Sequence, residues 1–124
     1  MDLWFLAAAV LSGLICLLHI FGGGPVTVPQ LITGDEDSGK VGRMTAYYCW
    51  HIVTIIIAAQ ALAFWMAAGS AEAHDLALFA SSGAFLFAVW SLAMIAIYRL
   101  KPLLYPQWVL FFPVAAIGFV GLYR

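Results

Sequence analysis

The chain has 124 residues, of which 65% are hydrophobic and only 9% are charged, and its mean hydropathy is +1.03. Soluble domains carry about 25% charged residues, so this composition excludes an ordinary soluble domain. The net charge of −1 provides no basic surface for nucleic acid. The function must therefore lie among membrane helices, in their connections or in a partner.

The charged side chains are placed so that four long segments contain none. No Asp, Glu, Lys or Arg occurs in residues 3–34, 44–71, 76–98 or 102–123, and each segment is at least 22 residues long. A helix needs about 20 apolar residues to cross the hydrocarbon core of a bilayer, where a central charge costs at least about 2.5 kcal/mol. The pattern predicts an all-α integral membrane protein, an antiparallel four-helix bundle that forms one transmembrane domain over residues 1–124.

The first helix is predicted over residues 3–21, because the sequence Gly22-Gly23-Gly24-Pro25 favours helix termination. A cytoplasmic loop over residues 22–43 is expected to follow, with an exposed acidic turn at Asp35-Glu36-Asp37. The remaining helices are predicted over residues 44–68, 75–98 and 103–123. Pro113 predicts a kink in the last of them.

Basic residues give the expected orientation of these helices. Lys40 and Arg43 precede the second helix, and Arg99 and Lys101 follow the third, whereas the opposite side holds only Arg124. Connections rich in Lys and Arg stay in the cytoplasm. The count predicts a multi-pass protein of the cell inner membrane, with both termini outside the cytoplasm.

Two histidines are the main candidates for chemistry, because ionisable groups inside membrane segments are costly. His19 and His51 both fall in the cytoplasmic half, at similar predicted depths. Tyr47 lies one turn from His51, and Tyr98 could be a fourth member of a ligand- or cofactor-binding site. His19 and His51 could ligate a b-type haem, or could bind a metal ion together with Cys16. Alternatively, the histidines hydrogen-bond each other, a tyrosine or loop carbonyls, or they handle protons.

Small and polar residues recur at helical spacing on three of the predicted helices. We interpret these stripes as helix contact faces, with hydroxyls bonded across or back along the helices. Gln60, on the face of its helix opposite His51, is predicted to bond a neighbouring helix. The stripes comprise Ala8, Ser12, Cys16 and His19; Tyr47, His51, Thr54 and Ala58; and Ser81, Ala84, Ala88, Ser91 and Tyr98.

Two short segments resemble a known group of proteins. Residues 18–23 (LHIFGG) and 47–54 (YYCWHIVT) are similar to parts of small, uncharacterised bacterial four-helix membrane proteins. The resemblance implies an inner-membrane location and attaches no activity to the chain.

Missing motifs narrow the expected function further. No uncharged segment contains a carboxylate, which argues against a proton-coupled exporter, and no sequence signature of a soluble enzyme is present. We therefore expect a non-enzymatic accessory or binding subunit in the lipid bilayer, as a homo-oligomer or within a larger membrane complex. The alternatives are a membrane redox protein that holds haem b or a metal between His19 and His51, and a small transporter or channel lined by the Ser/Thr stripes.

Overall fold

The computed structural model describes residues 1–33 and 39–124, and the regular structure within these ranges is entirely helical. The first helix consists of α1 (Leu3–Leu17), the π-helix η1 (Leu18–Gly23) and α2 (Gly24–Thr33), which follow one another without a break. The other elements are α3 (Gly39–Gly69), the short 3₁₀-helix η3 (Ala71–Ala73), α4 (His74–Tyr98) and α5 (Gln107–Tyr123). The predicted acidic turn lies outside the described residues.

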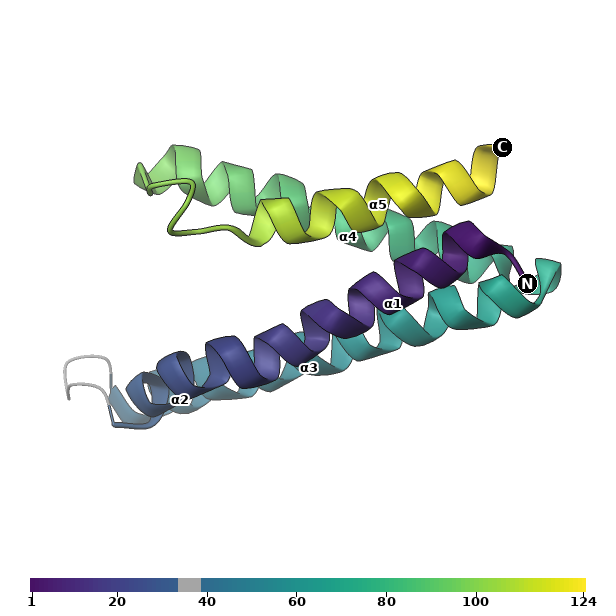
Figure 1. The fold of residues 1–124 in the computed structure, drawn as a ribbon. Coiled ribbons are helices and arrows are strands. Elements are labelled where there is room, and N and C mark those ends of the chain that lie inside the picture. Colours follow the sequence, from purple (N-terminus) through teal and green to yellow (C-terminus); the bar gives the residue numbers. More distant parts are fainter. Residues whose placement is uncertain (34–38) are drawn as a thin grey trace.

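These helices form two antiparallel hairpins (Figure 1). The first hairpin pairs α1, η1 and α2 with α3, and the second pairs α4 with α5. Both ends of the chain lie beside the turn between α3 and α4, and we call this side of the molecule the closed end (Figure 1). The side with residues 99–106 and the start of α3 is called the open end.

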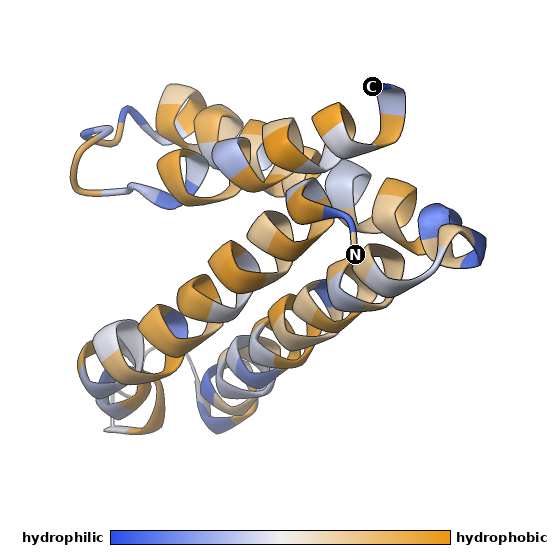
Figure 2. Ribbon diagram, turned by 45° about the vertical axis from the view of Figure 1, so that its right-hand side comes forward, coloured by the Kyte–Doolittle hydropathy of each residue, from blue (hydrophilic) through white to orange (hydrophobic). Residues whose placement is uncertain are grey.

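Three helices are long and apolar enough to cross a membrane, namely Leu3–Thr33, Gly39–Gly69 and Ala71–Tyr98. The first two have 31 residues each and extend about 46 Å at about 1.5 Å per residue, which exceeds the hydrocarbon core of about 30 Å. α5 is equally apolar but has only 17 residues. Hydrophobic residues cover the lengths of the helices, and hydrophilic residues gather near the helix ends (Figure 2).

The packed core fills the closed end of the first hairpin and most of the length of the second. Buried side chains lie within residues 5–16, 57–68, 77–91 and 111–121, and no residue is buried in the described parts of 17–56. The two hairpins diverge toward the open end (Figures 1 and 2). The four helices therefore pack together at one end, while the first hairpin continues beyond the core as an uncovered pair.

The predicted contact faces on α1 and α4 are confirmed by the burial of all their members except His19 and Tyr98, whereas no member of the predicted face on α3 is buried. Ser81 Oγ donates a hydrogen bond to the Ala77 carbonyl at 2.7 Å, as expected for hydroxyls bonded back along their own helix. The buried hydroxyls of Ser12 and Ser91, by contrast, have no hydrogen-bond partner within the described residues. Gln60 Nε2 donates to the Ala80 carbonyl on α4 at 3.1 Å, which confirms the predicted bond to a neighbouring helix. The buried members of these faces are Ala8, Ser12, Cys16, Ser81, Ala84, Ala88 and Ser91.

The prediction that the first helix ends at residue 21 is wrong. Gly24 keeps right-handed helical angles (φ −55°, ψ −52°), and its N–H donates to the His19 carbonyl five residues earlier. Pro25 has no N–H and would crowd the carbonyl four residues before it in a regular α-helix. The wider π-turn changes the hydrogen-bond register just before this proline, so the chain remains helical to Thr33.

The predicted loop over residues 22–43 is therefore also wrong where the structure describes it. Residues 22–33 are helical, and α3 begins at Gly39 instead of residue 44. Lys40 and Arg43 lie in the first turns of α3, because a helix can extend past the apolar segment that crosses a membrane. α4 starts one residue before its predicted bound of 75, and α5 starts at Gln107 instead of residue 103.

Asp2 joins three elements at the closed end. Its Oδ1 accepts hydrogen bonds from the Trp4 and Phe5 amides at 2.9 and 3.3 Å, and its carboxylate pairs with the Arg124 guanidinium. Its own backbone N–H donates to the Ala68 carbonyl at 2.8 Å. Partial burial opposes ionisation of the Asp2 carboxyl, but Arg124 and the two amides outweigh this and hold its pKa below the ordinary value of 3.8.

Asp2→Asn should therefore have a pH-dependent effect on stability. The substitution retains a capping oxygen and removes the charge, and an exposed ion pair contributes up to about 1 kcal/mol. The Asp2 carboxyl has a lower pKa in the folded chain than in the unfolded chain, so its ionised form stabilises the fold at pH values above the unfolded-state pKa. This stabilisation is lost as the pH falls through the folded-state pKa. Thermal unfolding in detergent micelles should show a less stable variant at pH 7, and the difference in stability should disappear once the pH falls below the folded-state pKa of Asp2. A difference that persists at the lower pH would contradict the assigned ion pair.

Candidate functional site

Four aromatic rings gather on the first hairpin beyond its buried core, and we call them the ring cluster. The His19 ring stacks on Trp50 with a centroid distance of 3.9 Å and an interplanar angle of 19°. The Tyr47 ring meets His51 edge to face, with centroids 4.6 Å apart and an angle of 86°. The cluster joins η1 to the middle of α3.

The π-helix positions the first of these rings. His19 lies in η1, where π-turns inside longer helices often mark functional sites. Gly23, in the same segment, permits the Trp50 ring to approach closely, because an added Cβ would lie 3.0 Å from Trp50 Cη2. The Trp50 carbonyl contacts His19 Nε2 at 3.3 Å and accepts a bond from Thr54 Oγ1 at 3.3 Å. Both the ring and the carbonyl of Trp50 are thus held in place.

A groove of about 550 Å³ lies between the two helices beside this cluster, and we call it the His51 groove. Its α3 wall consists of Trp50, His51 and Thr54, and its opposite wall includes Phe21, Pro25 and Val28 from η1 and α2. The groove therefore combines apolar walls with one imidazole and one hydroxyl. Within residues 1–33 and 39–124, no Asp, Glu, Lys or Arg lines it.

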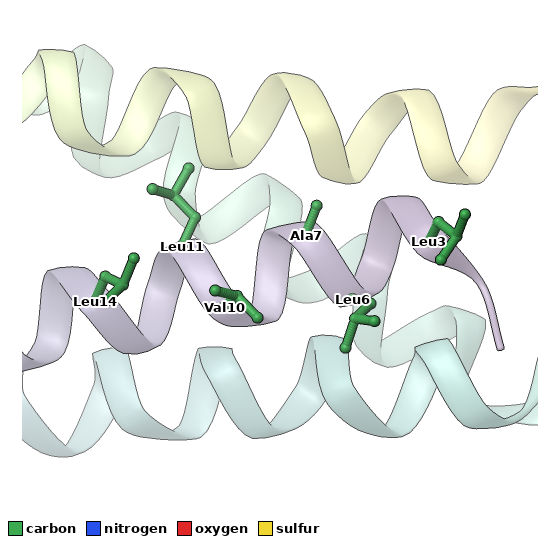
Figure 3. Close-up of a pocket in the computed structure, with 6 residues that line it drawn as sticks. All are labelled: Leu3, Leu6, Ala7, Val10, Leu11 and Leu14. Atoms are coloured by element: carbon green, nitrogen blue, oxygen red, sulfur yellow. The ribbon is translucent and has the colours of Figure 1, made fainter.

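Two other grooves are each built by a single helix and lack this combination. One, of about 400 Å³, is lined only by apolar side chains of α1, which runs between α5 and α3 (Figure 3). Its residues are Leu3, Leu6, Ala7, Val10, Leu11 and Leu14. The other, also about 400 Å³, lies along the start of α3 and includes Lys40 and Tyr48. Of these three grooves in the described part of the chain, the His51 groove alone has walls from two helices and polar groups at mid-helix.

The predicted site residues are only partly brought together. Tyr47 contacts His51, whereas the ring partner of His19 is Trp50. Tyr98 lies at the end of α4 with 64% of its surface exposed, on the hairpin that diverges from the ring cluster. Cys16 is buried one turn before His19, with its thiol directed to the Thr54 carbonyl at 3.7 Å.

The proposed metal or haem ligation stays a prediction. Among the described residues, no group of three His, Cys, Asp or Glu side chains is placed to share a metal ion. His19 Nε2 already faces the Trp50 carbonyl, so only its Nδ1 is left for another partner. The geometry thus favours a site in which His51, instead of a pair of histidines, meets a ligand.

Trp50 was not among the predicted site residues, although its ring is the platform on which His19 stacks. The sequence signal for the π-helix that positions His19 was indirect, because three glycines before a proline can mark either a widened helical turn or the end of a helix. The same turn sets which face of η1 meets α3. Thr54, three residues after His51, was recognised as part of a polar stripe, and both residues line one groove.

No protein-family model matches the chain, and comparisons with curated proteins and with solved structures give no match. The resemblance seen in residues 18–23 and 47–54 therefore stays a prediction.

Proposed function

We propose that the chain is a multi-pass inner-membrane protein that acts as a non-enzymatic binding subunit within a larger membrane assembly. The observation that carries this proposal is the uncovered part of the first hairpin, residues 17–33 and 39–56, which contains no buried residue. This part nevertheless bears the ring cluster and the His51 groove. A surface of this kind gains its packing from a second molecule.

Membrane insertion is supported by the three long apolar helices. In the proposed arrangement α5, about 26 Å long at about 1.5 Å per residue, completes an even number of crossings. The open end, with Lys40, Arg43, Arg99 and Lys101, faces the cytoplasm by the positive-inside rule. Alkaline phosphatase fused after Arg124 should then be active, because the enzyme matures only outside the cytoplasm.

Polar groups on the uncovered hairpin support a protein partner in addition to lipid. His51 is exposed, and its ring nitrogens have no hydrogen-bond partner within the described residues. Tyr48 is 64% exposed on the same helix. Polar side chains within a membrane favour the interior of an assembly over contact with hydrocarbon, so a neighbouring helix at this surface would lower their free energy.

Photo-crosslinking in native membranes tests this proposal. A photoreactive amino acid at Ile55, one turn after His51 and 67% exposed, should capture a protein and give a discrete mass shift. Leu86, at the middle of α4 and 62% exposed, is the matched control and should capture lipid only. Capture of a second copy at residue 55 would identify a homo-oligomer. Lipid adducts alone at both positions would contradict the binding-subunit proposal.

A further inference from the structure

The His51 groove has the composition of a small-molecule site. Such sites usually have volumes of about 300–1,000 Å³ and mostly apolar walls, with a few polar groups that orient the ligand. The groove has a volume of about 550 Å³ and places the polar groups of His51 and Thr54 three residues apart on α3, opposite Phe21, Pro25 and Val28. It therefore fits a mostly apolar molecule with a polar edge.

The hydrogen-bonding groups define that edge. Thr54 Oγ1 donates to the Trp50 carbonyl, so its hydrogen is already engaged. The imidazole of His51 contacts Tyr47 by its ring and makes no hydrogen bond within the described part of the chain. A neutral imidazole carries one N–H donor, so His51 can supply a donor to the groove beside the indole N–H of Trp50. The matching group on a ligand is an acceptor such as a carbonyl oxygen.

The remaining walls restrict the ligand further. No charged side chain lines the groove among the residues that the structure describes, so an ionic ligand would meet no counter-charge from them. Trp50 offers an aromatic surface that is fixed by the His19 stack, and flat rings pack well against such a surface. The ligand chemistry is thus neutral, planar and carbonyl-bearing, and the apolar helices around the groove require that it dissolve in lipid.

We propose that the His51 groove binds the head ring of an isoprenoid quinone, with a ring carbonyl accepting a hydrogen bond from His51. The ring lies against Trp50, and the apolar tail leaves the groove between η1 and α3. This inference rests on the membrane location in the proposed function and is independent of a protein partner. It involves binding alone, without electron transfer to the chain.

Titration of the purified protein in lipid nanodiscs with decylubiquinone tests the inference, because quinones quench tryptophan fluorescence. Quenching should saturate, and Trp50→Phe should remove much of its amplitude. His51→Ala should weaken binding about tenfold, as expected for the loss of one hydrogen bond, and His51→Gln, which keeps a donor, should recover most of the affinity. His74→Ala is the matched control, since His74 contacts Phe5 at the closed end, and it should bind as tightly as the unmodified chain.

Competitors separate the possible sources of the carbonyl. The tail-free ring 2,3-dimethoxy-5-methylbenzoquinone should displace decylubiquinone, and decanol should not. If a monoacylglycerol competes as well as the ring, an ester lipid is the ligand and the quinone assignment is overturned. Quenching that rises linearly and equally in His51→Ala and in the unmodified chain also overturns it. Because this assay contains no partner, its failure is distinct from a failure to crosslink at residue 55.

Discussion

Replacing Gly118 by alanine is expected to lower the free energy of unfolding by about 1–3 kcal/mol, the usual cost of overpacking a close contact. An added Cβ at Gly118 would lie 2.1 Å from Ser81 Oγ and 2.9 Å from Phe64 Cε1. The clash joins α5 to both α4 and α3, so no single helix can relieve it by a small shift. Unfolding by sodium dodecyl sulfate in mixed micelles, followed by circular dichroism, measures the effect.

Gly83→Ala is the matched control for this substitution. Gly83 is also helical, but an added Cβ there meets no atom within 4 Å, so alanine should be neutral or stabilise α4 by up to about 1 kcal/mol. Adding Ser81→Ala to Gly118→Ala should restore part of the stability, because the nearest clashing atom is then removed. Equal stabilities of the Gly118 and Gly83 variants would show that the helices do not approach closely at residue 118.

Phe5→Ala is expected to cost about 3 kcal/mol, near the lower limit for a buried phenylalanine because lipid replaces water as the alternative surroundings. The Phe5 side chain is 0% exposed and packs edge to face on His74 at 5.2 Å. Its ring also fills the space left by Gly121, where an added Cβ would lie 2.7 Å from Phe5 Cε1. Loss of this ring leaves a cavity where the two hairpins meet.

The same denaturation assay tests Phe5, with Phe79→Ala as the control. Phe79 is 79% exposed on α4, so its truncation should change the free energy of unfolding by less than about 0.5 kcal/mol. Similar losses for both phenylalanines would place the core elsewhere than at the closed end.

The bounds of α4 and the end of α3 were predictable because charged or turn residues limit their apolar segments. α4 (His74–Tyr98) lies within one residue of its prediction because Asp75 and Arg99 limit the uncharged stretch, and Arg99 ends the helix with a positive φ of 51°. Gly69 and Ser70 likewise marked the end of α3. The small-residue faces and the bond of Gln60 to α4 followed from the cost of leaving polar groups unpaired.

The course of the chain from residue 22 to residue 43 could not be predicted from the same signals. A glycine run terminates a helix only when its backbone leaves the right-handed region, and here Gly24 stays within it. Helix rotation was equally undetermined, because it depends on packing between helices. His19 and His51 were placed at similar depth, yet the π-turn directs His19 onto Trp50. The divergence of the hairpins also depends on crossing angles that apolar lengths do not specify.

The closed end also sets an order of events during synthesis. Asp2 pairs with Arg124, 122 residues later, and Phe5 packs against Gly121. α1 can pair with α3 as soon as both have been made, but its contacts with Gly121 and Arg124 must wait for α5. At about 5–20 residues added per second, that delay is on the order of ten seconds. Throughout this interval Asp2 lacks its ion-pair partner Arg124, and Phe5 lacks the packing surface of Gly121.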